Sequence, residues 1–327
     1  MNAVTVKDLR KTFRRPRRSA GAFGALKGLI RPQFNDFQAV AGVSFQIAEG
    51  ERVAIIGPNG AGKSTTLKML CGVLEPTGGD AQVLGLTPWR QRQALAYRLG
   101  VVFGQRSQLW PELAARESFA LLRRIYDQPL DVFTRRLGEL CERFAIADLL
   151  DQAPGRMSLG QRMRCEIVAS LLHGPDLLLL DEPTIGLDVT AKAAIRDFIR
   201  DEAAAGGRTV LLTSHDARDV ELVCERVIVI SAGRIVLDEP TEGLRRRFGA
   251  RKLITFRSAA RSIIVEMAGV TRRASEPHTT VLDVDTSVAR VEAVVAAGLA
   301  QGAIEDVSVE DPPMEEVVHE IYAAVGV

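Results

Sequence analysis

Residues 57–65 are Gly57-Pro58-Asn59-Gly60-Ala61-Gly62-Lys63-Ser64-Thr65, which fit the pattern Gly-x-x-x-x-Gly-Lys-Ser of a phosphate-binding loop. An apolar stretch typical of a strand, Val53 to Ile56, precedes this loop, and a helical stretch, Thr65 to Cys71, follows it. Glycines let backbone N–H groups converge on an anion, and the helix N-terminus adds its dipole. The loop therefore predicts a nucleoside triphosphate site, with Lys63 reaching the β- and γ-phosphates and Ser64 ligating Mg²⁺.

A second segment carries acidic residues at the end of a predicted strand. The run Leu177 to Leu180 is apolar and is followed by Asp181 and Glu182. Such a run is typical of a buried parallel strand, whose C-terminal end lies at the ligand-binding edge of an α/β sheet. We expect Asp181 to hold Mg²⁺ opposite Ser64, and Glu182 to orient and deprotonate the attacking water.

Further motifs follow in a fixed order along the chain. These are Gln105, Met157-Ser158-Leu159-Gly160-Gln161, Gly186-Leu187-Asp188, and His215 after the predicted strand Thr209 to Thr213. Together with the phosphate loop and the Asp181–Glu182 pair, they make residues 1 to about 240 resemble the ATP-binding subunit of an ABC transporter. The signature segment of that family is usually Leu-Ser-Gly-Gly-Gln, and here Leu159 replaces its first glycine. The segments Val102–Trp110, Ser158–Glu166 and Asp181–Asp188 resemble the ABC-2 type exporter branch, among viologen-exporter-like ATPase components.

The resemblance implies an α/β fold, a P-loop ABC ATPase with a β-rich opening, a helical subdomain and a small C-terminal α+β module. We predict an ATP-binding domain over residues 1–245, with residues 107–158 as its helical subdomain, and an accessory domain over 246–327. Residues 160–240 alternate between strand and helix patterns, which favours a parallel sheet. In the tail, strands are expected at Lys252–Phe256, Thr279–Val284 and Ala303–Val309, and helices at Val288–Ala300 and Met314–Ala324.

The resemblance also implies roles for single residues, with ATP and Mg²⁺ as the bound groups. Gln105 touches Mg²⁺ and the attacking water, while His215 bonds the γ-phosphate and holds the water against Glu182. Lys63, Glu182, Gln105 and His215 are thus the expected catalytic set, and Ser64, Asp181 and Gln105 the expected metal contacts.

A second group of residues is expected to act on the ATP of an opposing subunit. Ser158, Gly160 and Gln161 of the signature cap the nucleotide on the opposing phosphate loop, and Asp188 bridges to that loop. The chain has one phosphate loop and one signature, so it needs a second ATPase. A homodimer is the simplest choice, and a heterodimer with a related ATPase remains open.

Recognition of adenine is assigned to Phe13 by offset ring stacking, with Phe37 as the competing candidate and core packing of Phe13 as the structural alternative. Between the predicted strands Ala3–Leu9 and Ala39–Ile47 lies an insertion, Lys11–Phe37, with a basic start. This insertion either meets anionic lipid headgroups or is a solvated loop.

Composition limits the partners. A net charge of +1 over 327 residues predicts no nucleic-acid binding field. No apolar run approaches the ~20 residues that span a bilayer, and no secretory pattern begins the chain. Together with these observations, the resemblance implies a protein at the cytoplasmic face of the membrane, peripheral to separate permease subunits. The four cysteines, which are far apart in sequence, are expected to be reduced and buried.

In the family, the helical subdomain and the Gln105 segment form the groove that receives a short helix of the membrane subunit. Trp110 and Phe119 are candidates to line it, and core packing is the equal alternative. The tail has no catalytic constellation, so the resemblance leaves it a role in dimerisation or in regulation.

The predicted function is ATP hydrolysis that drives a transporter of the ABC-2 type in export. The alternative is a soluble ABC ATPase on the ribosome or on DNA. Ribosomal members usually carry two cassettes, and the DNA-associated ones separate loop and signature by a long coiled coil, unlike this chain. Intact Lys63, Glu182 and His215 argue against a scaffold that does not hydrolyse ATP.

Overall fold

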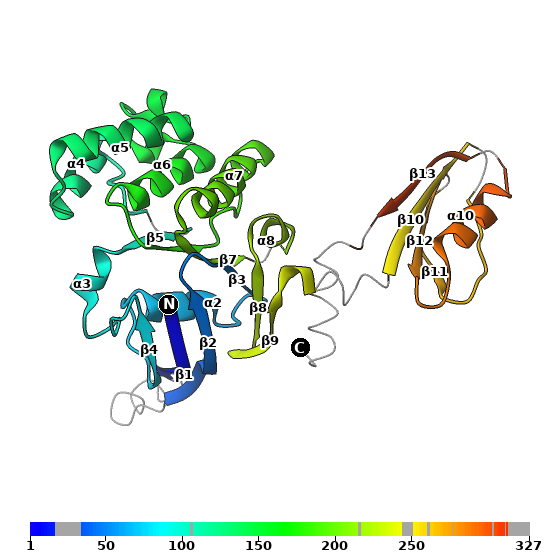
Figure 1. Cartoon of the computed structure of the whole chain (residues 1–327), viewed down its shortest axis with the longest axis horizontal. Helices are drawn as coiled ribbons and strands as arrows, with labels where there is room; N and C mark the ends of the chain where they lie inside the picture. Colours follow the sequence, from blue (N-terminus) through cyan, green and yellow to red (C-terminus); the bar gives the residue numbers. More distant parts are fainter. Residues whose placement is uncertain are drawn as a thin grey trace, which may run out of the picture. The chain divides into compact units, whose positions relative to one another are not determined.

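The computed structural model describes residues 1–16, 34–104, 107–214, 217–243, 251–259, 262–276, 278–302, 304–310 and 312. They fall into two compact units, Met1–Asp238 and Glu239–Gly326, which are described separately below (Figure 1). The division follows Asp238, whereas the sequence suggested a boundary after residue 245.

The first unit is built on a six-stranded sheet of order β5-β6-β7-β3-β8-β9. These strands are β5 (Leu99–Phe103), β6 (Leu177–Asp181), β7 (Thr209–Ser214), β3 (Arg52–Ile56), β8 (Arg226–Ser231) and β9 (Arg234–Pro240). The first five run parallel, and β6 and β7 are almost wholly buried. Strands covered on both faces need continuous apolar runs, which explains the four leucines of β6.

A smaller antiparallel sheet of order β2-β1-β4 forms the β-rich opening. It contains β1 (Asn2–Pro16), β2 (Phe34–Ala48) and β4 (Gly78–Val83). The predicted insertion Lys11–Phe37 is too long, because β1 and β2 continue pairing as a ladder out to Pro16 and Phe34. Only 17–33 remain between the strands, and they lie outside the described residues, whereas the basic residues Lys11, Arg14 and Arg15 belong to β1.

Helix α2 (Lys63–Leu70) lies between the two sheets and supplies the core that joins them. Its Leu67 and Leu70 belong to one buried cluster with Val6 and Leu9 of β1 and Ile55 of β3. Burial of each such side chain contributes about 1.5–3 kcal/mol. Since α2 begins at the phosphate loop, this packing also fixes the loop.

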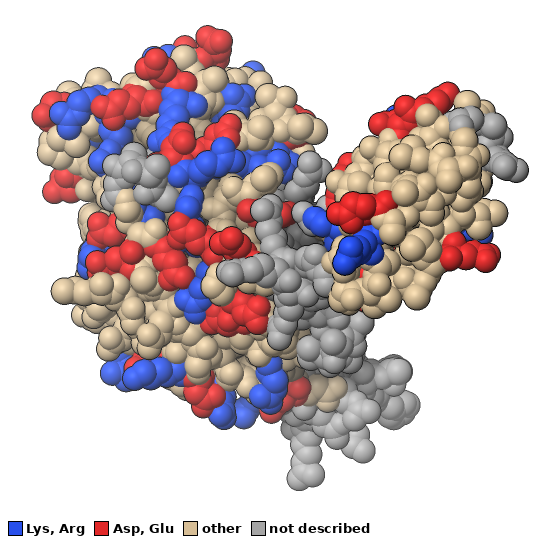
Figure 2. Space-filling view, turned by 45° about the vertical axis from the view of Figure 1, so that its right-hand side comes forward, with Lys and Arg blue, Asp and Glu red and all other residues tan. Residues whose placement is uncertain are grey.

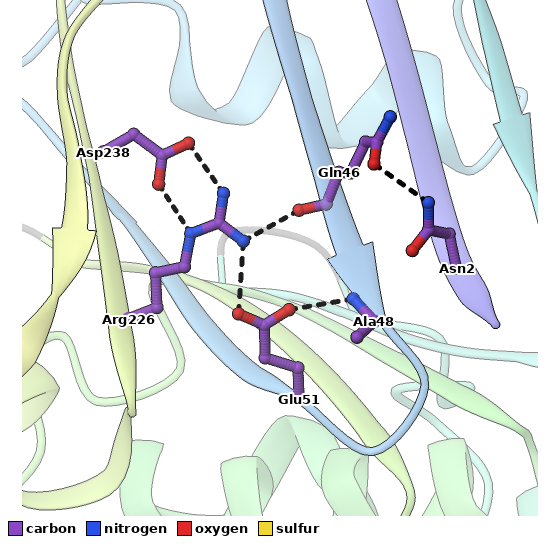
Figure 3. A network of polar contacts seen from close by, with 6 residues as sticks. All are labelled: Asn2, Gln46, Ala48, Glu51, Arg226 and Asp238. Atoms are coloured by element: carbon purple, nitrogen blue, oxygen red, sulfur yellow. Dashed lines mark hydrogen bonds and ion pairs between the residues drawn. The ribbon is translucent and has the colours of Figure 1, made fainter.

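The two sheets are also joined by Arg226 of β8 (Figure 3). Its guanidinium donates two bonds to Asp238 of β9, of 2.6 and 2.7 Å, and further bonds to Glu51 Oε1 (3.2 Å) and to the backbone O of Gln46 in β2 (2.9 Å). Glu51 in turn accepts from the backbone N–H of Ala48 at 2.8 Å. The hydrogen bonds to Asp238 raise the pKa of Arg226, so this junction stays charged at any physiological pH.

Helices form the rest of the first unit, and α4, α5 and α6 gather as one bundle (Figure 1). The helices are α3 (Arg92–Ala96), α4 (Ala115–Ile125), α5 (Leu130–Arg143), α6 (Leu159–Leu171), α7 (Val189–Gly206) and α8 (Ala217–Val223), with 3-10 turns η1 (Ala147–Leu149) and η2 (Pro154–Arg156). Phe119 is 0% exposed, so of its two alternatives the structure shows core packing and not groove lining. Trp110 is 38% exposed. All four cysteines are buried, and none of them forms a disulfide.

The second unit is a four-stranded antiparallel sheet of order β11-β12-β10-β13 with helix α10 (Val291–Leu299) on one face. Its strands are β10 (Arg251–Ser258), β11 (Val270–Glu276), β12 (Thr279–Asp285) and β13 (Ile304–Glu310). β11 was not predicted, and the expected helix Met314–Ala324 lies outside the described residues. On the face away from its core, Asp283 accepts hydrogen bonds from Arg251 and Arg273.

Charge is evenly mixed over the visible face of the first unit, where acidic and basic side chains alternate (Figure 2). The visible face of the second unit is largely uncharged.

Candidate nucleotide-binding site

The phosphate loop connects β3 to α2, and its glycines are needed for its shape. A Cβ on Gly57 would lie 2.3 Å from the backbone O of Ile230, and one on Gly62 would lie 2.5 Å from that of Ala39. Gly62 also has φ +108°, a conformation that side chains rarely adopt. The loop can therefore approach its neighbours this closely only with glycine at both positions.

Lys63 is only 4% exposed, although it is the charged side chain of the phosphate loop. Its Nζ donates to the backbone O of Gly57 at 2.7 Å and of Pro58 at 3.3 Å, and lies 3.6 Å from Glu182 Oε1. Burial lowers the pKa of Lys63, while the Glu182 carboxylate opposes that shift. The ammonium is thus held at the loop, next to the carboxylate expected to act as base.

The predicted metal contacts, Ser64 and Asp181, lie together. Ser64 Oγ donates to Asp181 Oδ1 at 2.8 Å, and Thr213 Oγ1 donates to the same oxygen at 2.7 Å. Hydroxyl and carboxylate oxygens are the ligands that Mg²⁺ takes from proteins, and phosphates and water complete its shell. The oxygen pair beside the phosphate loop therefore fits Mg²⁺, although among the described residues no cluster of three or more His, Cys, Asp or Glu side chains occurs.

Thr213 is a member of this site that the sequence reasoning missed. It is the last residue but one of β7 and lies directly beside Asp181 in the sheet register. Its Oγ1 also accepts the backbone N–H of Glu182 at 3.1 Å. A polar residue in the last positions of an apolar strand was the available signal. Glu182 itself has φ +52°, so its backbone conformation is strained.

Phe13 and Phe37 are direct partners across β1 and β2, and both rings line the same pocket of about 600 Å³. Both candidates for the adenine contact therefore line one pocket. Lys11 Nζ lies 5.4 Å from the centre of the Phe13 ring. The lining residues are Phe13, Arg14, Phe37, Ala39, Asn59, Gly60, Ala61, Gly62, Lys63, Ser64, Thr65 and Glu182.

The signature residues are not part of that pocket. Ser158 is the N-cap of α6: its Oγ accepts from Gln161 N at 3.2 Å, and Gln161 Oε1 accepts from Ser158 N at 2.9 Å. Leu159, in place of the usual glycine, is 37% exposed. Gly160 lies next to Asp188, which caps α7 by accepting from Ala191 N at 2.8 Å. Ser158, Gly160, Gln161 and Asp188 thus form one neighbourhood at two helix N-termini.

Two predicted site residues, Gln105 and His215, lie outside the described residues.

This geometry defines a P-loop nucleotide-binding protein. The family model for ABC transporters matches residues 40–185. The daunorubicin resistance ATP-binding protein DrrA3 of Streptomyces coeruleorubidus is 32% identical over 295 residues, which are 87% of this chain and 91% of the relative. The Nod factor export ATP-binding protein I of Ralstonia nicotianae is 35% identical over 222 residues, covering 67% of this chain and 68% of the relative.

A solved dimeric structure of the ATP-binding cassette MJ0796 bound to ADP and Pi is 26% identical with a TM-score of 0.61, covering 73% of this chain and 98% of that chain. The chain belongs to the ATP-binding proteins of ABC transporters, and the predicted family, fold and ATPase activity are confirmed. ATP-binding domains of this family dimerise and work with membrane subunits. No helix in the described part of the chain is long and apolar enough to cross a membrane.

Proposed function

We propose that two copies of this chain close around two ATP molecules with Mg²⁺, and that the cycle of closure and hydrolysis drives separate membrane subunits in export. One observation carries the proposal. Ser158 and Gly160, which the family uses on the γ-phosphate, lie outside the pocket of their own chain, at the exposed start of α6. The pocket is therefore incomplete without a second signature segment.

Glu182 is the proposed general base. Its Oε1 lies 3.6 Å from Lys63 Nζ, and arrival of the γ-phosphate gives the ammonium a stronger anionic partner. We expect this exchange to release the carboxylate toward the attacking water. Ser64 and Asp181 hold Mg²⁺, and Thr213 keeps the Asp181 oxygen oriented by its 2.7 Å hydrogen bond. Mg²⁺ supplies charge stabilisation for the phosphates when bound.

Adenine stacks on Phe13 and Phe37, in the proposed site. Two rings from paired strands give the base a wider apolar platform than one, and each contributes about 1 kcal/mol. Gln105 and His215 keep their expected roles on the attacking water and the γ-phosphate. Ser158, Gly160, Gln161 and Asp188 act on the nucleotide of the other copy.

The proposed docking place for the membrane subunit is a groove of about 720 Å³ on the helical subdomain. Two segments line it, residues 111–114 after the Gln105 segment and residues 148–156 before the signature. A partner there contacts both the chain after Gln105 and the chain before Ser158. The protein would thus be peripheral at the cytoplasmic face of the membrane. Likeness to the Nod factor export protein supports the outward direction.

The test is affinity purification of the chain from membranes in detergent, with mass spectrometry of the proteins retained. Glu112→Arg and Asp148→Arg place bulky cations in the groove, and Glu142→Arg on exposed α5 is the matched control. We expect multi-span proteins with wild type and with the control, and their loss with the groove variants. Recovery of ribosomal or DNA-repair proteins without any membrane chain would overturn the transport assignment.

A further inference from the structure

Glu166 is a buried carboxylate on the helix that begins at the signature. It is 5% exposed and lies eight residues after Ser158 on α6, about two turns along the helix. Burial raises the pKa of Glu166. Its neighbours along α6, such as Cys165 and Ile167, are apolar and fully buried. Packing alone would be satisfied by an apolar side chain, which avoids the cost of burying a charge.

Both carboxylate oxygens of Glu166 are used by one short segment of chain. Ser107 Oγ donates to Oε1, and the backbone N–H of Gln108 donates to Oε2 at 3.1 Å. The side chain of Gln108 returns the contact, since its Nε2 donates to the backbone O of Glu166 at 2.9 Å. Ser107 Oγ also accepts from Leu109 N at 3.1 Å, which closes the segment on itself. Residues 107–109 are thus attached to α6 mainly through this one residue.

The next residues of the same segment are fixed to the helical subdomain too. Trp110 N donates to the buried Ser118 Oγ of α4 at 3.3 Å, and Gly155 N donates to Pro111 O at 3.0 Å. Residues 107–111 are therefore bonded to the helical subdomain. Ser107 is only two residues after Gln105 in the chain. At the other end of this connection, α6 starts at Ser158.

We infer that Glu166 is a positioning residue for ATP hydrolysis, which makes residues 107–109 and the signature helix move as one body. Displacement of the chain after Gln105 by nucleotide is then transmitted along α6 to Ser158. The inference rests on the proposed function in one respect, that Ser158 serves the nucleotide of a second copy. Glu166 does not touch the nucleotide pocket, so its effect is on turnover and not on ATP affinity.

The first test is Glu166→Gln, which keeps the side-chain volume but replaces one acceptor oxygen by an NH₂ group that cannot accept a hydrogen bond. We expect kcat to fall about tenfold with KM for ATP within twofold of wild type, the pattern of an interaction made after binding. Ser170→Ala is the matched control, because its buried hydroxyl donates only within α6, to Ile167 O at 2.7 Å. The control should leave kcat unchanged at a similar melting temperature.

Ser107→Ala tests the same link from the other side and avoids any change in α6. If Glu166 acts through this segment, Ser107→Ala lowers kcat in the same direction, and the double variant is no slower than the slower single variant. Fully multiplied losses in the double variant would mean that Glu166 acts elsewhere. Should Glu166→Gln fail to fold, wild-type kcat in Ser107→Ala would by itself overturn the inference.

The fluorescence emission of Trp110 gives a readout whose response to ATP would not change if Glu166 had a purely structural role. In a Trp89→Phe background it is the single tryptophan, directly after the attached segment. We expect ATP to change its emission, and Glu166→Gln to abolish most of that change while ATP still binds. An unchanged emission response and unchanged kcat in Glu166→Gln would contradict the inference. Failure of the proposed function is a separate result, namely that wild type forms no ATP-dependent dimer.

Discussion

The phosphate-loop side and the signature side of this ATPase differ in how complete they are within one chain. On the first side Lys63 is buried, and the hydroxyls of Ser64 and Thr213 both donate to Asp181 Oδ1. On the second side Ser158 and Gln161 cap each other at the start of α6, and Leu159 is exposed. A site whose polar groups are preorganised is ready for its ligand, whereas an exposed helix start is ready for a partner. The described residues of the phosphate-loop side are thus bonded within the chain, whereas the signature side presents an exposed helix start.

The largest effect is expected from the base. Glu182→Gln should lower kcat by about 10³-fold or more, because the amide cannot take the proton of the attacking water. ATP binding should persist, and a stable ATP-bound dimer should accumulate in size-exclusion chromatography. The exposed Glu142→Gln on α5 is the control. Unchanged turnover in Glu182→Gln would remove this residue from its proposed role.

Acid should lower the stability of the protein through His173, at the C-terminal end of the signature helix α6. His173, just after α6, stacks on Tyr126 at 3.9 Å, and burial lowers its pKa from 6.5 to about 4. The folded state therefore favours the neutral imidazole of His173, whereas the unfolded chain takes up a proton near pH 6.5. The stability that the buried neutral imidazole contributes is complete above pH 6.5 and is lost as pH falls toward 4. We expect a loss of about 2 kcal/mol between pH 7 and 5.

Urea denaturation of wild type and of His173→Phe, measured at pH 7 and pH 5, checks this expectation. Phenylalanine keeps the stacked ring and cannot titrate, so its stability should fall less between the two pH values. Equal losses in both proteins would show that His173 is not the group responsible.

A smaller effect is expected from Thr213, which acts through Asp181. Thr213→Val removes the hydroxyl at nearly constant volume, and we expect kcat to fall about tenfold with a higher Mg²⁺ requirement. Thr209→Val is the matched control on the same strand, since Thr209 Oγ1 accepts from Gly50 N at the far end of β7. If extra Mg²⁺ does not restore kcat in Thr213→Val, or if Thr209→Val loses kcat to the same extent, Thr213 does not orient the metal ligand.

The smallest effect is expected at the adenine end. Phe13→Ala and Phe37→Ala should each raise KM for ATP about fivefold, from the loss of roughly 1 kcal/mol of ring contact. Tyrosine at either position should restore KM because it keeps the stacking face. An effect confined to Phe13→Ala would mean that Phe37 lines the pocket without touching adenine, so that Phe13 alone stacks on it.

Particular residues show how much of the fold and the site the sequence could predict. Lys63, Ser64, Asp181 and Glu182 follow local patterns, because strand ends and glycine turns determine where they lie. Phe37 and Thr213 depend on strand register, which no short motif encodes across an insertion or between distant strands. Glu166 interrupts an otherwise apolar helix face, and only the tertiary structure brings residues 107–108 against it. Phe119 shows the converse, since an aromatic side chain looks the same in sequence whether it lines a groove or a core.

The most direct test of the central claim, that the signature of one copy serves the nucleotide of the other, mixes two inactive variants. Lys63→Ala disables the phosphate loop, and Ser158→Asp keeps the helix cap while placing a negative charge against the γ-phosphate of the other copy. Each variant alone should be inactive, because both sites of its dimer carry the defect. Mixed dimers should hold one intact site, and the mixture should regain about one quarter of wild-type turnover from random pairing. No recovery, with mixed dimers demonstrated by differently tagged chains, would show that each chain uses its own signature and would contradict the account.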